Sequence, residues 1–149
     1  QVHNSLVQAG FEHYEVSNYA LKGFRSKQLV NWRNVEYLGI GPGAHSYNGE
    51  VRRWCDQPIE EYVGGVEYGS EELTARDRLN EYVMTSLRRV EGIDLSYIAQ
   101  RFGRAEAERI ERAAKVWLDA KTVIRQGDRL ALPTSKFMLS DAVIESFFA

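Results

Sequence analysis

The hydrophobic and polar positions of the N-terminal third predict a helix followed by two strands. Apolar residues recur about one helical turn apart from Val2 to Ala9 and stop at Gly10, a residue type that often ends helices. Residues 13–20, "HYEVSNYA", alternate as a strand does, and 36–41, "EYLGIG", form the continuous apolar run of a strand buried on both faces. This order is typical of the end of an α/β unit with a parallel sheet.

Beyond residue 41 the sequence shows a hairpin signal and then a proline- and glycine-containing stretch. Asn48 and Gly49 lie between strand-like residues in "YNGEVRRW", and such a pair favours a hairpin turn. From Pro58 onward the chain combines a proline suited to a helix start with three glycines that would end the helix early. We therefore expect a first domain over 1–57, a linker helix within 58–73, and a C-terminal domain after it.

Residues 74–149 predict a helical domain that contains one small hairpin. Thr74 and Asp77 resemble a capping box, and apolar residues then recur at helical spacing in three successive segments. Two short strands surround Gly127, and Ser140 is expected to cap a last apolar helix. Three helices, a hairpin and a closing helix make a winged-helix-like domain, so the predicted fold class is α+β.

Composition and charge exclude several classes of protein. The chain has 149 residues, 44% of them hydrophobic, and its net charge of −2 gives no overall attraction to nucleic acid or anionic membranes. No apolar run reaches the roughly 20 residues of a spanning helix, and Cys55 is the single cysteine. In the third helix, 104–120, four basic side chains are matched by four acidic ones, which removes most of the counterion release that drives DNA binding. We expect a cytoplasmic protein with no nucleic-acid partner.

The stretch "YLGIGPGAHSYNG" at 37–49 places Gly39, Gly41 and Gly43 at every second position. A phosphate cradle is disfavoured because Pro42 removes one backbone N–H group and no helix follows. Glycines in a strand allow a bulky flat ligand, or another backbone, to lie against it. Tight packing at a strand end explains them equally well.

Four polar residues near these strands are candidates for binding. His45, beside the glycines, is either a ligand-binding histidine or a hydrogen-bonded structural one. Glu15 needs a hydroxyl, amide or cationic partner if it points inward, while Ser17 and Asn18 either contact a ligand or cap the turn. Between positions 21 and 53 six basic residues accompany two acidic ones, a local charge of +4 that suits either a carboxylate ligand or a solvated basic loop.

Together, "YEVSNYA" at 14–20, "YLGIGPGAHS" at 37–46 and the final "LSDAVIESFF" resemble the C-terminal part of a radical-SAM family. This family contains the oxygen-independent coproporphyrinogen III oxidases and the related haem chaperones, and the two-domain pattern looks more like the chaperone branch. The resemblance covers nearly the whole chain. It implies a C-terminal fragment, in which residues 1–57 form the last strands of a partial (β/α)6 barrel with a basic loop.

The same resemblance implies cofactors and a site. In the whole protein a [4Fe–4S] cluster and S-adenosylmethionine would accompany the tetrapyrrole, which is haem or coproporphyrinogen III. The cluster loop is missing from this chain, so we expect no catalytic residue, no metal ligand and no radical chemistry here. The implied cofactor-binding residues are those of the glycine strand and its surroundings: Gly39, Gly41, Gly43, Ala44, His45, Ser46, Glu15, Ser17, Asn18 and Trp32.

One stretch departs from the family pattern. The family usually shows an HNxxYW motif, proposed to take part in haem binding, where this chain has "SKQLVNW", with Gln28 in place of the histidine and Leu29 in place of the asparagine. Glutamine is a poor iron ligand compared with imidazole. If haem binds, His45 or His13 are therefore the alternatives for its axial ligand.

Two other functions remain open on the sequence. One is a true coproporphyrinogen III oxidase, a redox enzyme that decarboxylates propionate side chains to vinyl groups. The other is a self-standing winged-helix interaction module. Without the partner strands of the barrel, the exposed edges of strands 13–20 and 36–41 would tend to pair two copies of the chain. The sequence does not identify the protein that would receive haem.

Overall fold

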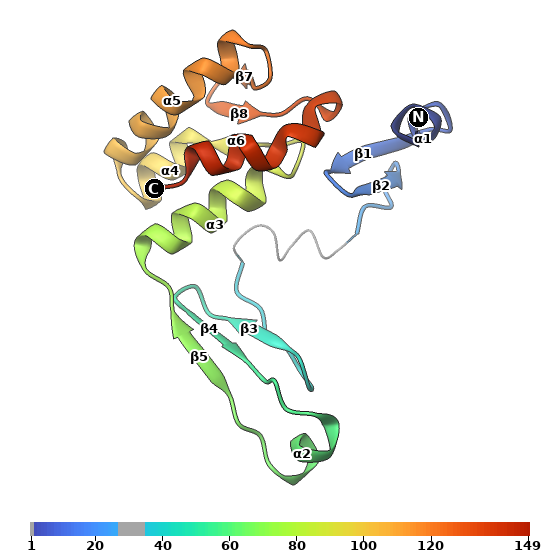
Figure 1. Ribbon diagram of the computed structural model, residues 1–149, viewed down its shortest axis with the longest axis vertical. Coiled ribbons are helices and arrows are strands. Elements are labelled where there is room, and N and C mark those ends of the chain that lie inside the picture. Colours follow the sequence, from blue (N-terminus) through green and yellow to red (C-terminus); the bar gives the residue numbers. More distant parts are fainter. Residues whose placement is uncertain (1, 27–34) are drawn as a thin grey trace.

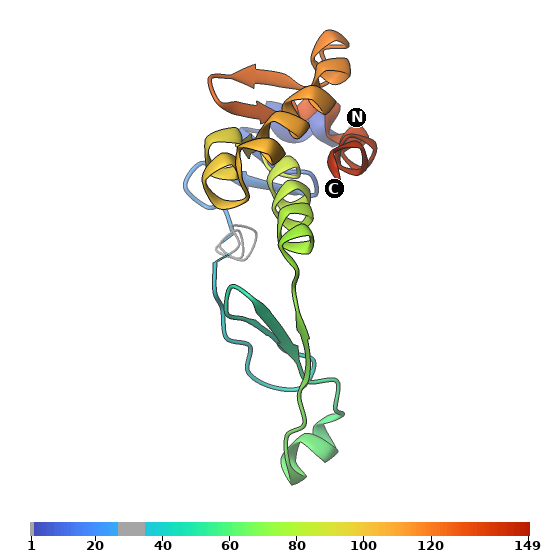
Figure 2. The same cartoon turned by 90° about the vertical axis from the view of Figure 1, so that its left-hand side faces the viewer.

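The computed structural model describes residues 2–26 and 35–149, so the predictions for Gln28 and Trp32 lie outside the described residues. Helices and strands both occur, which confirms the α+β class at that level. Figure 1 shows two bodies: a helical body with a small N-terminal hairpin beside it, and a three-stranded sheet that extends away from it. In the view of Figure 2 the chain runs from this sheet directly into the first helix of the helical body.

The N-terminal segment folds as a helix and a tight antiparallel hairpin. Its elements are α1 (Val2–Gln8), β1 (Phe11–Glu15) and β2 (Asn18–Leu21). The helix is confirmed, but the single strand predicted over 13–20 is wrong. The Glu15 carboxylate accepts hydrogen bonds from the Ser17 N–H at 3.0 Å and from Asn18 Nδ2 at 2.6 Å. These local bonds fold the chain back directly after β1.

The separate sheet has the strand order β3-β4-β5, with antiparallel neighbours. Its elements are β3 (His45–Tyr47), β4 (Val51–Trp54), the connecting helix α2 (Ile59–Gly64) and β5 (Gly69–Glu72). The predicted hairpin is confirmed, and Asn48 Oδ1 accepts hydrogen bonds from the N–H groups of Glu50 and Val51. The helix expected after Pro58 is also confirmed, as α2. Strand β5 has no counterpart in the prediction, because "GSEE" carries no apolar alternation.

The apolar segment 36–41 is not the buried strand that was predicted. Among the described residues it forms one antiparallel bridge, between Tyr37 and Tyr47, while Leu38 and Ile40 are 80% and 86% exposed. A buried parallel strand needs a neighbour on each side. This segment lies beside the edge strand β3 alone among the described strands, and every pairing described there is antiparallel.

The helical body follows the predicted order closely. Its elements are α3 (Ala75–Leu87), β6 (Ile93–Asp94), α4 (Leu95–Arg101), α5 (Arg104–Asp119), β7 (Ile124–Gln126), β8 (Arg129–Ala131), η2 (Thr134–Leu139) and α6 (Ser140–Phe147). The capping box of Thr74 and Asp77 is confirmed. The predicted cap at Ser140 is wrong, because Leu139 occupies the cap position and Ser140 is the first helical residue.

The main hydrophobic core lies within this helical body. Val83, Leu87, Ile98, Ile110 and Phe147 are fully buried, and they come from α3, α4, α5 and α6. Their helical spacing places one apolar stripe of each helix against the others. None of the described helices has the length and apolar character needed to cross a membrane.

Backbone and ion-pair contacts attach the other parts to α3. The N-terminal hairpin is held by Val16, whose N–H donates to the Arg88 carbonyl at 2.9 Å, and by Tyr14, whose carbonyl accepts from the Val90 N–H at 3.2 Å. The β3-β4-β5 sheet is held by Arg52 of β4, which pairs with Glu81 of α3. Helix α3, together with the residues that follow its C-terminal end, therefore connects the hairpin and the sheet.

Candidate functional site

A cavity of about 590 Å³ lies between the β3-β4-β5 sheet and the segment 36–38. Its volume falls within the range of roughly 300–1,000 Å³ found for small-molecule sites. Ring and aliphatic side chains share its lining with one arginine and one glutamate. The lining residues are Glu36, Tyr37, Leu38, Ser46, Tyr47, Asn48, Val51, Arg53 and Tyr68.

The alternation of the strands selects which side chains share a face. Ser46 of β3 lies opposite Arg53 of β4, which lies opposite Ser70 of β5, so these three share one face. Val51 lies two residues before Arg53, and Tyr68 lies two residues before Ser70, so both side chains point to this same face. The cavity lining thus combines apolar and aromatic side chains with one cation, Arg53, from the middle strand of the sheet.

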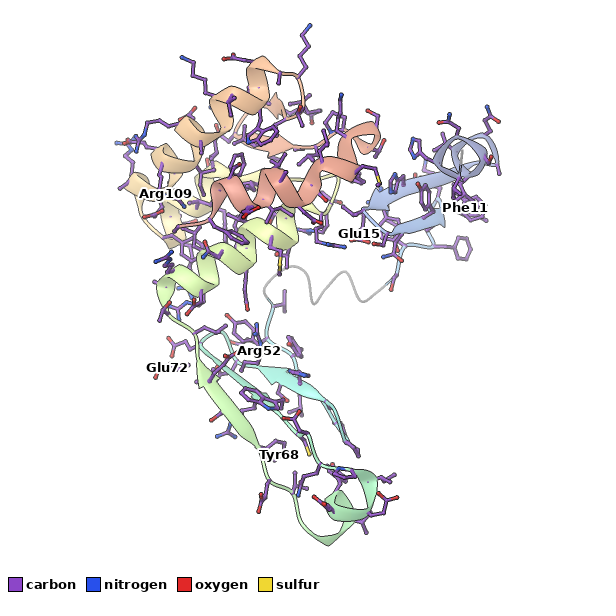
Figure 3. The ribbon with its side chains drawn as sticks, in the orientation of Figure 1. Phe11, Glu15, Arg52, Tyr68, Glu72 and Arg109 are labelled. Carbon is purple, nitrogen blue, oxygen red and sulfur yellow. The ribbon has the colours of Figure 1, made fainter. Side chains whose placement is uncertain are left out.

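The two neighbouring arginines of β4 have different surroundings. Arg52 lies on the opposite face, where its guanidinium pairs with Glu71 at 3.0 Å and with Glu81. Burial lowers the pKa of Arg52, but the hydrogen bond and the charge of Glu81 together raise it by more than burial lowers it. The pKa of Arg52 is therefore raised above its ordinary value. Arg53 is exposed, and no ion pair of the described residues engages it. Figure 3 shows Arg52 at the end of the sheet nearest α3 and Tyr68 toward the other end.

Gly39 is required by the close approach of another backbone. A Cβ atom there would lie 2.8 Å from the carbonyl carbon of His45, and closer still to its oxygen. The Gly39 N–H also donates to Ser46 Oγ at 3.0 Å. Of the two close neighbours that the sequence allowed for this glycine, a ligand or a backbone, the structure places a backbone there.

Gly41 and Gly43 have a different reason to be glycine. Their φ angles are 106° and 71°, and no atom lies within 4 Å of a Cβ built on either. Glycine adopts this left-handed conformation at little cost. The resulting turn brings the Gly43 N–H to 2.7 Å from the Cys55 carbonyl and the Ala44 carbonyl to 3.2 Å from the Cys55 N–H. The turn therefore aligns β3 with β4.

His45 and Ser46 are neighbours in sequence but point to opposite faces of the sheet. His45 is exposed and its ring stacks beside Trp54 of β4, with centroids 6.3 Å apart and planes 25° apart. Ser46 lines the cavity. The structure thus brings Ser46 into the cavity and leaves His45 on the other side.

The candidates Glu15, Ser17 and Asn18 lie at the N-terminal hairpin and not at the cavity. Glu15 is 1% exposed, and besides Ser17 and Asn18 its carboxylate accepts from Arg88 Nε at 3.3 Å. Figure 3 shows Glu15 facing the helical body, away from the sheet. The partner that a buried Glu15 requires is thus supplied by this chain's own amide and guanidinium groups.

His13 also belongs to the N-terminal hairpin. Its Nε2 lies 3.2 Å from the Val16 carbonyl, and its Nδ1 lies 3.1 Å from Nδ1 of His3. Both ring nitrogens therefore have partners within the chain. Part of the predicted basic loop is also paired, since Arg25 binds Glu12 and Glu91.

Sequence reasoning missed Arg53 and Tyr68 as members of one site. Arg53 entered the prediction as one charge of a basic region, and Tyr68 as part of a linker. The alternation within "VRRW" could have separated Arg53 from its ion-paired neighbour. Tyr68 could not have been found, because its position depends on β5.

Residues 73–135 match the family model described as the HemN C-terminal domain. The heme chaperone HemW of Bacillus subtilis is 33% identical over 111 residues, which cover 70% of this chain and 29% of that protein. The heme chaperone HemW of Mycobacterium tuberculosis is 35% identical over 149 residues, which cover 95% of this chain and 36% of that protein. The chain thus spans between 29% and 39% of the length of the first curated relatives that it matches.

A solved structure shares the fold. It is titled "Coproporphyrinogen III oxidase (HemN) from Escherichia coli is a Radical SAM enzyme", with a TM-score of 0.70 and 17% sequence identity over 99% of this chain and 39% of that one. Together these matches confirm the resemblance to the C-terminal part of the radical-SAM haem chaperones and coproporphyrinogen III oxidases.

Proposed function

We propose, from the similarity to the C-terminal part of the HemN and HemW proteins, that this chain is part of a haem chaperone and that its sheet cavity contacts the tetrapyrrole. On this proposal residues 1–57 complete a radical-SAM barrel and 74–149 form a winged-helix-like domain. The single observation that carries the proposal is the cavity beside the glycine segment, with Arg53 in its lining.

The chemistry of the cavity suits a flat molecule with apolar faces and a carboxylate edge. Tyr68, Leu38 and Val51 supply ring and aliphatic surface for a macrocycle. Arg53 supplies a guanidinium, which binds carboxylates through two parallel hydrogen bonds. On this proposal haem is the cargo of the protein. Glu36 would repel a propionate, so the propionate is expected on the Arg53 side.

The axial ligand of haem would not come from His45 in this arrangement, because His45 points to the other face of the sheet. Cys55 is also unsuited, since it is buried and its thiol faces Gln57 Oε1 at 3.6 Å. We therefore propose that the cavity residues bind the macrocycle and its carboxylates, and that the iron ligand lies elsewhere in the whole protein.

Radical chemistry is outside the reach of this chain alone. A thiolate-bound [4Fe–4S] cluster needs several cysteines, and the chain has one. In the whole protein the cluster and S-adenosylmethionine would supply the radical chemistry. The chain's own residues would shape the side of the cavity that faces the tetrapyrrole.

The curated relatives favour a chaperone over an oxidase, because those that cover 95% of this chain are named heme chaperones, whereas the solved structure titled as a coproporphyrinogen III oxidase is 17% identical and shows the fold alone. Turnover of coproporphyrinogen III by the whole protein would support the oxidase instead. A nucleic-acid role for α5 is disfavoured, since Arg109 donates inward to the Phe147 and Phe148 carbonyls. Location in the cytoplasm and pairing of two copies through strand edges stay predictions, and sedimentation would measure the latter.

The test is a haem titration of the 149-residue chain followed at the Soret band. Saturable one-to-one binding is expected, and Arg53→Gln should weaken it about tenfold, the effect of losing about 1.4 kcal/mol of charged hydrogen bonding. Arg112→Gln is the matched control, because Arg112 is an exposed arginine of α5 in the helical body. Absence of binding, or equal weakening by both variants, would contradict the proposed site.

A further inference from the structure

Two histidine rings contact each other where α1 meets the N-terminal hairpin. His3 of α1 and His13 of β1 form a side-chain hydrogen bond, with their Nδ1 atoms 3.1 Å apart. The hydroxyl of Tyr19, from β2, lies 3.3 Å from the same Nδ1 of His3. A hydrogen bond between two imidazole nitrogens needs one donor and one acceptor. The number of hydrogens on the two rings therefore decides whether this contact can exist.

The main chain fixes which nitrogen of His13 carries a hydrogen. Its Nε2 lies 3.2 Å from the carbonyl oxygen of Val16, and a carbonyl can only accept, so Nε2 is the donor. In neutral His13 the lone pair is then on Nδ1, and the hydrogen of the contact comes from Nδ1 of His3. The neutral pair thus has one hydrogen between the two rings, as a hydrogen bond requires.

Protonation of the pair changes this count in two steps. A first proton still leaves one of the two Nδ1 atoms without a hydrogen, so the hydrogen bond is kept. A second proton puts a hydrogen on all four ring nitrogens of His3 and His13. Two N–H groups then face each other across 3.1 Å, and two cationic rings have their centroids 5.1 Å apart. The doubly protonated pair cannot keep the contact.

The elements around the pair supply no free carboxylate to offset two positive charges. Helix α1 and strand β2 contain no acidic residue, and β2 contributes the neutral hydroxyl of Tyr19. The two carboxylates of β1 are engaged elsewhere, since Glu12 pairs with Arg25 and Glu15 pairs with Arg88. The second proton therefore meets repulsion that the described neighbours on these elements do not compensate.

Packing from the helical body fixes one of the two rings. The edge of His13 meets Phe137 of η2, with centroids 4.8 Å apart and planes at 80°. The charged residue of η2 is Lys136, which is exposed and is itself a cation. His13 also stacks on Tyr19, with centroids 4.0 Å apart and planes 9° apart. In contrast, α1 has no buried residue, so His3 and its helix are the part that can leave.

We propose that the His3–His13 contact is a pH-sensitive attachment of α1. It holds α1 on the β1-β2 hairpin while at most one of the two rings is protonated, and it releases α1 when both are. Histidine is the side chain whose charge ordinarily changes between about pH 5 and pH 8. Release is therefore expected on acidification, while the helical body, which the pair does not enter, stays folded.

The test is nuclear magnetic resonance of the 149-residue chain near neutral pH and at about pH 5. Near neutral pH, nuclear Overhauser contacts are expected between the ring of His3 and the rings of His13 and Tyr19, and the ring ¹⁵N signals should show His13 with its hydrogen on Nε2. At acid pH the contacts from His3 should be lost, while those between His13 and Tyr19 remain. Persistence of the His3 contacts with both rings protonated would overturn the proposal.

Two variants separate this device from a general effect of acid. In His3→Asn the side-chain amide offers both a donor and an acceptor and gains no charge, so contacts from position 3 to Tyr19 should survive at acid pH. The chain has three histidines, and His45→Ala, on the separate sheet, is the matched control that should release α1 as the unaltered chain does. Equal release in His3→Asn would overturn the proposal.

Hydrogen exchange distinguishes release of α1 from unfolding. The amides of Val83 and Leu87, which are fully buried in the helical body, should keep their protection at the pH at which α1 leaves. Loss of protection at these amides together with the His3 contacts would mean that acid unfolds the whole chain, and it would contradict a local device. Haem does not enter this test, so the pH-sensitive attachment and the proposed function can fail separately.

Discussion

Replacing Glu15 by glutamine removes a buried charge that pairs with Arg88 where the N-terminal hairpin attaches to the helical body. Its carboxylate is buried and accepts from the Ser17 N–H, from Asn18 Nδ2 and from Arg88, whose side chain is 26% exposed. Glutamine has the same shape, but it replaces one acceptor oxygen by an NH₂ group that would face other donors. Breaking a buried ion pair costs about 3–5 kcal/mol. Because Arg88 is partly solvated, we expect the lower end, about 3 kcal/mol.

For a domain of this length a loss of about 3 kcal/mol corresponds to a fall in melting temperature of about 6–12 °C. Thermal unfolding by circular dichroism would measure it. Hydrogen exchange at the Val16 and Val90 amides would show whether the hairpin detaches first, because these amides bond across the contact between hairpin and helix α3. Glu12→Gln is the matched control, since Glu12 lies in the same strand but forms a surface ion pair worth less than about 1 kcal/mol. Equal effects of the two variants would refute the role of Glu15.

Three further predictions concern single sites. Gly39→Ala should destabilise the sheet by about 1–3 kcal/mol through overpacking, whereas Gly64→Ala, with nothing within 4 Å of its Cβ, should be tolerated; thermal unfolding compares them. Thr74→Ala should cost about 1 kcal/mol as a lost cap, measured by urea unfolding. The Thr74 hydrogen bonds lower the pKa of Asp77, so their stabilisation is present above the unfolded pKa and lost as pH falls through the folded one; the acid limb of a stability–pH curve should flatten in that variant. Burial raises the pKa of Tyr82, so in a spectroscopic titration it should ionise after the exposed tyrosines.

The helical body could be predicted because its information is local. Capping by Thr74, the apolar stripes of the helices and the turn at Gly127 each depend on residues a few positions apart. The N-terminal hairpin could not be predicted in the same way. "HYEVSNYA" alternates as one strand, and it becomes two because Glu15 is buried beside Arg88, 73 positions away, and turns toward its own neighbours. A pattern read over eight residues does not contain that contact.

The three glycines show the same limit within one motif. Their spacing suggested that all three are glycine for one reason. Instead, a side chain at Gly39 would collide with the backbone of His45, whereas Gly41 and Gly43 adopt a left-handed turn. Gly39 lets its segment lie against β3, and the turn at Gly41 and Gly43 aligns β3 with β4. The cavity is then lined by what β3 and β4 carry, chiefly Ser46 and Arg53, and not by the glycines themselves.

The family match and the cavity lie on different bodies of the molecule. The match to the HemN C-terminal domain covers 73–135, whereas every lining residue of the cavity precedes position 69. The two are joined where Arg52 meets Glu81 and where the Leu73 N–H donates to the Glu50 carbonyl at 2.9 Å. The helical body therefore holds the sheet, and the sheet carries the proposed chemistry. Substitutions in the helical core test folding, and only substitutions on the Arg53 face of the sheet test tetrapyrrole binding.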